Sequence, residues 1–281
     1  MATAKAEIAA ASEATRELTT ADVWDALTEN RLVMQYQPQY DMRTGKMVAA
    51  EALTRLVDTS GKLIYPNRFI DFLEQSDLIV WLGRSVIERV CADLADCRAA
   101  GYEIERIAIN LSARQLNIDT GLVDHIDQMI VRYGLAYSDL EFELTERQCL
   151  TPQCEGMDVL NLLAERGVRI VIDDFGVGYS SVVYLAELPI SAFKLDCALI
   201  NRLPDDKAMQ TLVHSLLTLA KSLHLEVVAE GIENAAQNDY LVRAGCPYAQ
   251  GFAYAKPMGI EDLQAFMDAG SEAAGTGELI V

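Results

Sequence analysis

The sequence predicts an α/β protein with the architecture of a TIM-like (β/α)8 barrel, in which one strand near the start runs antiparallel to its neighbours. Three observations lead to this prediction. Strand-like and helix-like segments alternate over roughly 250 residues, which is the length of such a barrel. The first two strands are joined by a short turn, and the helical patterns end at glycines. A doubly wound open sheet is the alternative that this alternation leaves open.

Eight segments have the apolar and β-branched composition of strands: 33–39, 47–56, 107–111, 140–144, 169–172, 192–195, 226–229 and 248–252. Helical periodicity follows most of them, at 67–78, 84–99, 122–133, 155–166, 206–223, 235–244 and 260–267. Glycines 101, 134, 167 and 245 follow helical patterns, where a left-handed residue ends a helix. Thr19 and Asp22 form a capping-box pattern that predicts a short helix through Ala26.

The connection between the first two strands decides their relative direction. Only residues 40–46 join them, and these include the turn-like run from Asp41 to Gly45. A parallel crossover needs about a dozen residues or more. We therefore expect the first two strands to be antiparallel, so that one strand of the barrel is reversed.

The two ends of the chain differ from its middle. Residues 1–18 form a helical pattern that is polar on several sides, which predicts an N-terminal linker or stalk helix. Residues 270–281 are small and polar, and we expect a flexible tail there. The barrel is expected to span residues 19–269.

Composition excludes several classes of function. The 281 residues are 51% hydrophobic but contain no apolar run of the roughly 18 residues that a membrane span needs. The net charge of −19 argues against DNA as a partner, because a surface that follows phosphates should be basic. The six cysteines show no CxxC pair, and with only three histidines a zinc site is not expected. Reduced thiols and the lack of a signal-like N-terminus predict a cytoplasmic location.

Polar residues recur at the carboxyl ends of the predicted strands. In a barrel these ends converge on one mouth, where the chemistry resides. A single acid at such a position is most often a cap or an ion-pair partner, but polar residues at seven strand ends are hard to explain as caps. The residues are Glu51, Asn110, Glu143, Asp173, Asp174, Lys194, Glu230 and Gln250.

The adjacent acids Asp173 and Asp174 follow a buried strand and precede a glycine-containing loop. Two buried carboxylates repel each other unless a cation or a proton compensates them. Taken alone, Asp174 is equally well a turn former or a helix cap. With the other acids, the set offers only oxygen ligands, which suit Mg²⁺, Mn²⁺ or Ca²⁺. Two such ions would suit phosphodiester hydrolysis.

Strand parity separates the roles of neighbouring residues. Glu143 and Glu146 are three apart, so a regular strand aims only one of them inward. Lys194 and Asp196 share a face; Lys194 could orient or help deprotonate an attacking water, or form a salt bridge with Asp196. Arg55 could contact a substrate phosphate, and a surface arginine is the alternative.

At these residues the sequence resembles the EAL-domain family, cyclic di-GMP-specific phosphodiesterases, over about residues 24–267. The ordered set of motifs makes the resemblance specific, whereas a three-letter match would not. The motifs are Gln37-Pro38, Glu51-Ala52-Leu53 with Arg55, Asn110-Leu111-Ser112, Glu143-Leu144-Thr145-Glu146, the run from Asp173 to Ser181, Lys194-Leu195-Asp196, Ala229 to Glu233 and Gln250-Gly251-Phe252.

The resemblance implies hydrolysis of one phosphodiester of cyclic di-GMP to linear pGpG, with two Mg²⁺ or Mn²⁺ ions and with Ca²⁺ as a candidate inhibitor. It implies a first metal site of Glu51, Asn110, Glu143 and Asp173, and a second of Asp173, Asp174 and Glu230. Lys194 would contact the attacking water, and with Glu51 and Glu230 it would be a catalytic residue. The implied substrate contacts are Gln37, Leu53, Arg55, Asp196 and Gln250.

The resemblance also implies regulation. Glu146 would anchor a loop that begins after Asp174 and connects the site to a dimer interface. The loop and its supports are Phe175, Gly176, Gly178, Tyr179 and Glu233. A homodimer is expected on this ground, and an upstream sensor or GGDEF module is a candidate partner.

Four positions depart from the family pattern: Leu56, Asp77, Arg147 and Cys197. None is a predicted metal ligand, so the departures concern substrate affinity and regulation more than chemistry. Leu56 could loosen packing beside the substrate, and Asp77 and Arg147 could pair on the surface.

Three functions are therefore compared. An active phosphodiesterase is favoured, because the chain keeps both the carboxylates and the glycine loop. A binding module that senses cyclic di-GMP with little or no hydrolysis is the main alternative. A Mg²⁺-dependent barrel enzyme of another class, such as an enolase-like lyase, explains the acids but not the ordered motifs.

Overall fold

The computed structural model describes residues 19–145, 156–176 and 184–274. Its strands are β1 (Leu32–Asp41), β2 (Met47–Val57), β3 (Leu63–Ile64), β4 (Arg106–Asn110), β5 (Leu140–Thr145), β6 (Arg169–Phe175), β7 (Ala192–Leu195), β8 (Glu226–Ala229) and β9 (Tyr248–Ala249). Its helices are α2 (Thr20–Thr28), α3 (Ile70–Leu73), α4 (Leu78–Ala99), α5 (Ala113–Ile118), α6 (Leu122–Tyr133), α7 (Met157–Arg166), α8 (Tyr184–Glu187), α9 (Cys197–Ile200), α10 (Lys207–Leu223), α11 (Ala235–Ala244) and α12 (Ile260–Ala274), with 3₁₀ turns η1 (Pro66–Arg68) and η2 (Tyr137–Asp139).

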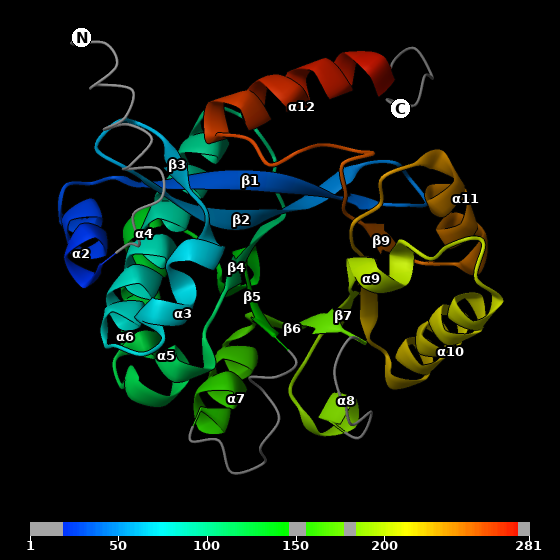
Figure 1. Cartoon of the computed structure of the whole chain (residues 1–281), viewed down its shortest axis with the longest axis horizontal. Helices are drawn as coiled ribbons and strands as arrows, with labels where there is room; N and C mark the ends of the chain where they lie inside the picture. Colours follow the sequence, from blue (N-terminus) through cyan, green and yellow to red (C-terminus); the bar gives the residue numbers. More distant parts are fainter. Residues whose placement is uncertain (1–18, 146–155, 177–183, 275–281) are drawn as a thin grey trace, which may run out of the picture.

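The strands form a closed barrel in the order β1-β9-β8-β7-β6-β5-β4-β2, and β1 pairs with β2 to complete the ring. Strand β3 lies outside the ring as an antiparallel extension of β2. Helices surround the barrel, and α12 lies along β1 (Figure 1). The predicted TIM-like architecture is confirmed.

Strand β1 is the reversed strand. It is antiparallel to both of its neighbours, β2 and β9, whereas the pairs from β2 through β4 to β9 are parallel. The turn after β1 reverses the chain at Gly45, whose φ of 67° lies in the left-handed region. The register places Gln37 opposite Glu51. The prediction from the short connection is therefore confirmed.

The prediction of one continuous helix over residues 67–78 is wrong. The chain forms η1, then α3, and a separate α4 that begins at Leu78. Phe69, Leu73 and Ile79 are all buried in the same core, so the apolar spacing continues across the break. The spacing reports which side is buried and does not detect the turn between α3 and α4.

Local capping explains most of the remaining helix boundaries. Thr19 and Asp22 form the predicted capping box at the start of α2. Gly134, Gly167 and Gly245 end their helices in the left-handed conformation.

The C-terminal helix is longer than predicted. Helix α12 continues to Ala274, so the proposed boundary at residue 269 falls inside a helix. The predicted stalk at residues 1–18 lies outside the described residues. None of the described helices combines the length and apolar character needed to cross a membrane.

An ionic layer closes the end of the barrel where the parallel strands begin. Glu141 Oε2 accepts hydrogen bonds from Arg106 Nε at 3.1 Å and from Arg169 Nε at 2.9 Å. Arg169 also pairs with Glu226, which accepts a hydrogen bond from the Tyr248 hydroxyl. The buried acid at this end is therefore paired with arginines.

Candidate active site

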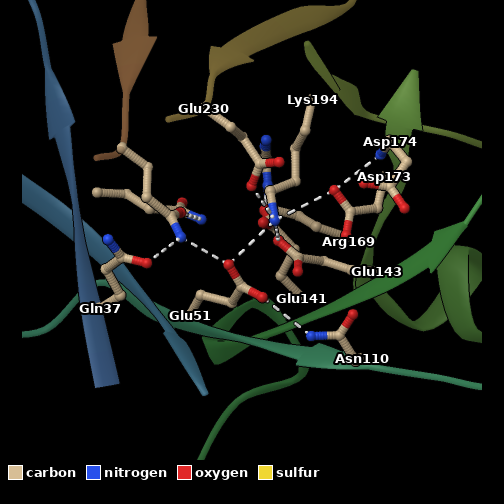
Figure 2. A network of polar contacts seen from close by, with 12 residues as sticks. Gln37, Glu51, Asn110, Glu141, Glu143, Arg169, Asp173, Asp174, Lys194 and Glu230 are labelled. Carbon is tan, nitrogen blue, oxygen red and sulfur yellow. Dashed lines mark hydrogen bonds and ion pairs between the residues drawn. The ribbon is translucent and has the colours of Figure 1, made fainter. Parts of the chain in front are cut away.

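The predicted polar residues converge at the carboxyl ends of the barrel strands (Figure 2). Lys194 on β7 is 1% exposed and occupies the centre of this group. Its Nζ lies 2.7 Å from Glu230 Oε1, 3.0 Å from Glu143 Oε1, 3.1 Å from Glu51 Oε2 and 3.4 Å from Asp173 Oδ1. The structure thus brings together side chains from four strands and from the residue that follows β8.

The acids around Lys194 determine the direction in which its pKa is shifted. Burial by itself would lower the pKa of Lys194, but the carboxylates, Asp173 foremost, raise it well above its usual value. The side chain is therefore an ammonium that donates hydrogen bonds. No salt bridge joins Lys194 to Asp196 among the described residues. Asp196 instead caps α9 by accepting from the Ala198 amide.

One ammonium does not compensate the acids around it. Burial, followed by repulsion from Glu51, raises the pKa of Glu143 well above its usual range. Burial and the charges of Asp173 and Glu51 raise the pKa of Glu230 to about 8. Burial also opposes ionisation of Glu51, but Lys194 and hydrogen bonds from Gln250 and Asn110 lower its pKa. The group is therefore short of positive charge.

A bulge in β6 explains how two adjacent acids serve one site. Neighbouring residues of a regular strand point to opposite faces. The register of β6 against β7 shifts between Ile172 and Phe175, and Asp174 takes a left-handed φ of 56°. The bulge turns Asp174 back toward the mouth, so that Asp173, Asp174 and Glu230 have ligand oxygens within 4.8 Å of one another.

These residues fit divalent cations. Asp173, Asp174 and Glu230 could together hold a metal ion. Beside them, Glu143 Oε2 is buried and has no hydrogen-bond partner among the described residues. Burial and Asp173 raise the pKa of Asp174 to about 6, so additional positive charge would favour its ionised form. Carboxylate and amide oxygens are ligands that Mg²⁺ and Mn²⁺ prefer.

The predicted substrate contacts Gln37 and Gln250 lie beside Glu51. They are 7% and 4% exposed, respectively. Gln250 Nε2 donates to Glu51 Oε2 at 2.6 Å and to Gln37 Oε1 at 3.1 Å. Gln250 therefore holds Glu51 directly and Gln37 supports Gln250, while contact of either glutamine with a substrate stays a prediction. Gln250 follows β9, which ends at Ala249 and is shorter than the predicted strand 248–252.

Arg55 is a buried residue rather than a surface arginine. Its side chain donates to Gln35 Oε1 and to the Thr54 carbonyl, each at 2.9 Å. Its guanidinium carbon also lies 4.9 Å from the centre of the Tyr65 ring. These contacts hold the guanidinium in one place, and its contact with a phosphate stays a prediction.

A cavity of about 420 Å³ opens beside the acids. Leu53 lines it, together with Glu51, Asn110 and Glu143, and its outer wall comes from α3, α4 and α5. Gln115 on α5 also lines it and is 1% exposed, and its Nε2 has no hydrogen-bond partner in the part of the chain that the structure describes. Gln115 was not predicted because the short helix α5 was not recognised; the signal was Ser112, which caps this helix.

Gly83 makes room for Gln115. A Cβ at Gly83 would lie 2.1 to 2.4 Å from the carboxamide atoms of Gln115, which is too close for any contact. Gly83→Ala would push the Gln115 carboxamide, the end of a flexible side chain, toward the adjoining cavity, and alanine favours a helix interior more than glycine does. We therefore expect the free energy of unfolding, measured by urea denaturation, to change by less than about 1 kcal/mol. A loss of several kcal/mol would show that Gln115 cannot move away.

The predicted loop residues fall partly outside the described chain. Glu146, Gly178 and Tyr179 lie beyond it, so the structure does not place them. Phe175 ends β6, is 4% exposed and packs against Phe193 at a tilt of 45°, with ring centres 4.8 Å apart. A Cβ at Gly176, whose φ is 103°, would lie 2.8 Å from Leu199.

Glu233 lies in the segment before α11. Its backbone amide donates to Gln237 Oε1 at 2.8 Å. The regulatory roles of Glu233 and the other loop residues stay predictions.

The structure places three of the four residues that depart from the family pattern. Leu56 is fully buried in the core and does not line the cavity, and its effect on packing beside a substrate stays a prediction. Asp77 pairs with Arg114 at 3.2 Å, while Arg147 lies outside the described residues. Cys197 is exposed at the start of α9 and packs against Gly231.

Known proteins resemble this chain in sequence and in structure. The family model described as EAL domain matches residues 20–257. The bifunctional diguanylate cyclase/cyclic di-GMP phosphodiesterase MucR of Pseudomonas aeruginosa is 38% identical over 244 residues, which cover 87% of this chain and 36% of that protein. The cyclic di-GMP phosphodiesterase PdeR of Escherichia coli is 38% identical over 234 residues, covering 83% of this chain and 35% of that protein.

A solved structure named PaMucR phosphodiesterase, c-di-GMP complex, superimposes with a TM-score of 0.80 at 37% identity, covering 86% of this chain and 98% of that chain. The chain spans about a third of the length of the curated relatives. The family model covers well over half of the chain, and the barrel with its acidic mouth agrees with it. The chain therefore belongs to the EAL domain family.

Proposed function

We propose that this chain hydrolyses one phosphodiester bond of cyclic di-GMP to give linear pGpG, with the help of two Mg²⁺ or Mn²⁺ ions. The observation that carries the proposal is the β6 bulge, which directs Asp173 and Asp174 together at Glu230. Relatives named as cyclic di-GMP phosphodiesterases support the substrate. Divalent cations between this acidic mouth and an anionic dinucleotide would offset the repulsion between them.

In this proposal Glu51, Asn110, Glu143 and Asp173 hold the first ion, and Asp173, Asp174 and Glu230 hold the second. When bound, the ions supply charge that polarises the phosphoryl group and favours ionisation of a water. Asn110 Nδ2 donates to Glu51 Oε1 at 3.0 Å, which leaves the side-chain oxygen of Asn110, Oδ1, for an ion.

Lys194 orients the attacking water. Its ammonium, whose pKa the surrounding acids raise, donates a hydrogen bond to that water. The proton of the water passes to a neighbouring carboxylate, and Glu230 Oε1 is nearest to Lys194 Nζ. The water oxygen bonds to phosphorus, the bond from phosphorus to one ribose oxygen breaks, and that oxygen takes up a proton.

Substrate binding is assigned to the cavity beside the acids. Leu53 lies on its wall, Arg55 lies two residues further along β2, and Asp196 lies next to Asp174, to which it contributes a hydrogen bond. The name of MucR, a bifunctional cyclase and phosphodiesterase, makes a GGDEF module a reasonable partner upstream. A homodimer belongs to the same proposal.

Turnover of cyclic di-GMP with Mg²⁺ or Mn²⁺ tests the proposal, with pGpG measured by chromatography. We expect Glu51→Ala to lower kcat by about 10²-fold or more, because it removes both a ligand and the partner of Gln250. Glu105→Ala is the control, since that side chain is 67% exposed and lies at the opposite end of the barrel. Excess chelator should weaken binding of cyclic di-GMP as well as turnover.

Two outcomes would contradict it. Tight binding of cyclic di-GMP without pGpG would identify a receptor instead of an enzyme. Equal affinity in the presence and absence of chelator would show that ions do not bridge protein and phosphate.

A further inference from the structure

A chain of amide hydrogen bonds joins the Ala255 carbonyl to Glu51. At one end, the Ala255 carbonyl accepts from Gln37 Nε2 at 3.1 Å. Gln37 Oε1 then accepts from Gln250 Nε2, and Gln250 Nε2 also donates to Glu51 Oε2. On its other side, Gln250 Oε1 accepts from Gln39 Nε2 at 3.0 Å.

The acceptors at the two ends of this chain determine how each glutamine amide is oriented. A backbone carbonyl can only accept, so Gln37 must turn its NH2 group to Ala255 and its oxygen to Gln250. Gln250 must therefore present its own NH2 group to Gln37 and Glu51. Its oxygen faces the opposite way, where Gln39 supplies the donor. Reversing the Gln250 amide would set its oxygen against the ionised Glu51.

Gln39 contributes little to the stability of the fold at this position. It is 1% exposed, and its own Oε1 has no hydrogen-bond partner among the described residues. A buried acceptor without a partner costs free energy, whereas an apolar side chain of similar shape would not. Stability therefore does not explain a glutamine here, and its hydrogen bond to Gln250 does.

We propose that Gln39 is a positioning residue: it holds the Gln250 amide with its NH2 group toward Glu51, and so keeps the Glu51 carboxylate in place for an ion. It contacts neither the substrate nor the ion. The proposal rests on the proposed function, which makes Glu51 a metal ligand. Gln39 lies on the reversed strand β1, opposite Ala49, and so below the level of Glu51.

Gln39→Met and Gln39→Glu test this proposal in the full chain. Gln39→Met removes the donor without adding a polar atom, so Mn²⁺ affinity and kcat should each fall about tenfold, with KM little changed and Tm unchanged or raised. Gln39→Glu is nearly isosteric but replaces the donor with an acceptor, which favours the reversed Gln250 amide. It should therefore lose more Mn²⁺ affinity than Gln39→Met does.

Mn²⁺ affinity is measured by isothermal titration calorimetry, with Gln264→Met as the control. Gln264 lies on α12, donates to Cys97 Sγ at 3.3 Å and takes no part in this chain of amides. A lower Tm with wild-type Mn²⁺ affinity and kcat would reduce Gln39 to a packing role and overturn the proposal. Wild-type protein that binds Mn²⁺ but releases no pGpG would overturn the proposed function instead, and the Mn²⁺ titrations of the Gln39 variants would still decide this inference.

Discussion

Lys194→Met is expected to unfold at a much lower temperature than the wild type in the presence of a chelator, and to regain most of that stability in Mg²⁺ or Mn²⁺. The ammonium of Lys194 is ion-paired with four acids in the barrel mouth: Glu51, Glu143, Asp173 and Glu230. Removing one partner of a buried ion pair costs about 3–5 kcal/mol, because the remaining charges lose their compensation. Cations that bind only the folded state restore stability by mass action.

Activity of the same variant should not recover with the metal. The side chain that orients the attacking water is gone, so kcat should stay about 10²- to 10⁴-fold below that of the wild type at saturating Mg²⁺. Differential scanning fluorimetry with and without chelator measures the first effect, and pGpG formation the second. Lys221→Met, at an exposed position on α10, is the matched control. An unchanged Tm in chelator would show that Lys194 is not needed to compensate the acids.

Glu141→Leu should destabilise the opposite end of the barrel without changing the chemistry. Glu141 is 1% exposed, and one of its oxygens accepts from both Arg106 and Arg169. Its loss leaves two largely buried guanidinium groups without their shared partner, which should lower the free energy of unfolding by about 3–5 kcal/mol.

Urea denaturation measures this loss, and Glu105→Ala is again the control. Glu105 also pairs with Arg106, but its side chain is 67% exposed, so its removal should change stability by less than about 0.5 kcal/mol. Under conditions where the Glu141 variant is folded, kcat should match that of the wild type. A large fall in kcat would mean that the ionic layer shapes the distant mouth.

The part of the fold that could be predicted depends on local patterns. Apolar periodicity located the barrel strands and most of the long helices, because each buries one side in the core. The short connection at residues 40–46 was enough to predict the reversed β1. Periodicity could not separate α3 from α4, since Phe69 and Ile79 are buried on either side of the break.

The site likewise has features that the sequence predicts and features that it does not. The acids and Lys194 could be listed from the sequence because they lie at strand ends, which a barrel brings together. Their charge balance could not, since it depends on distances among β2, β5, β6 and β7. Gln39 and Gln115 were missed because a buried glutamine is recognised by its partners, and these are distant in sequence or absent among the described residues.

By itself, the sequence determined the family motifs, the barrel and the type of metal that its oxygen ligands suit. All of these depend on residue type and on spacing along the chain. Only the tertiary structure decided that Asp174 faces the same mouth as Asp173, because this requires the bulge in β6. Only it revealed that Glu51 accepts from the Gln250 amide after β9, which in turn bonds to amides from β1 that closure of the barrel brings beside it.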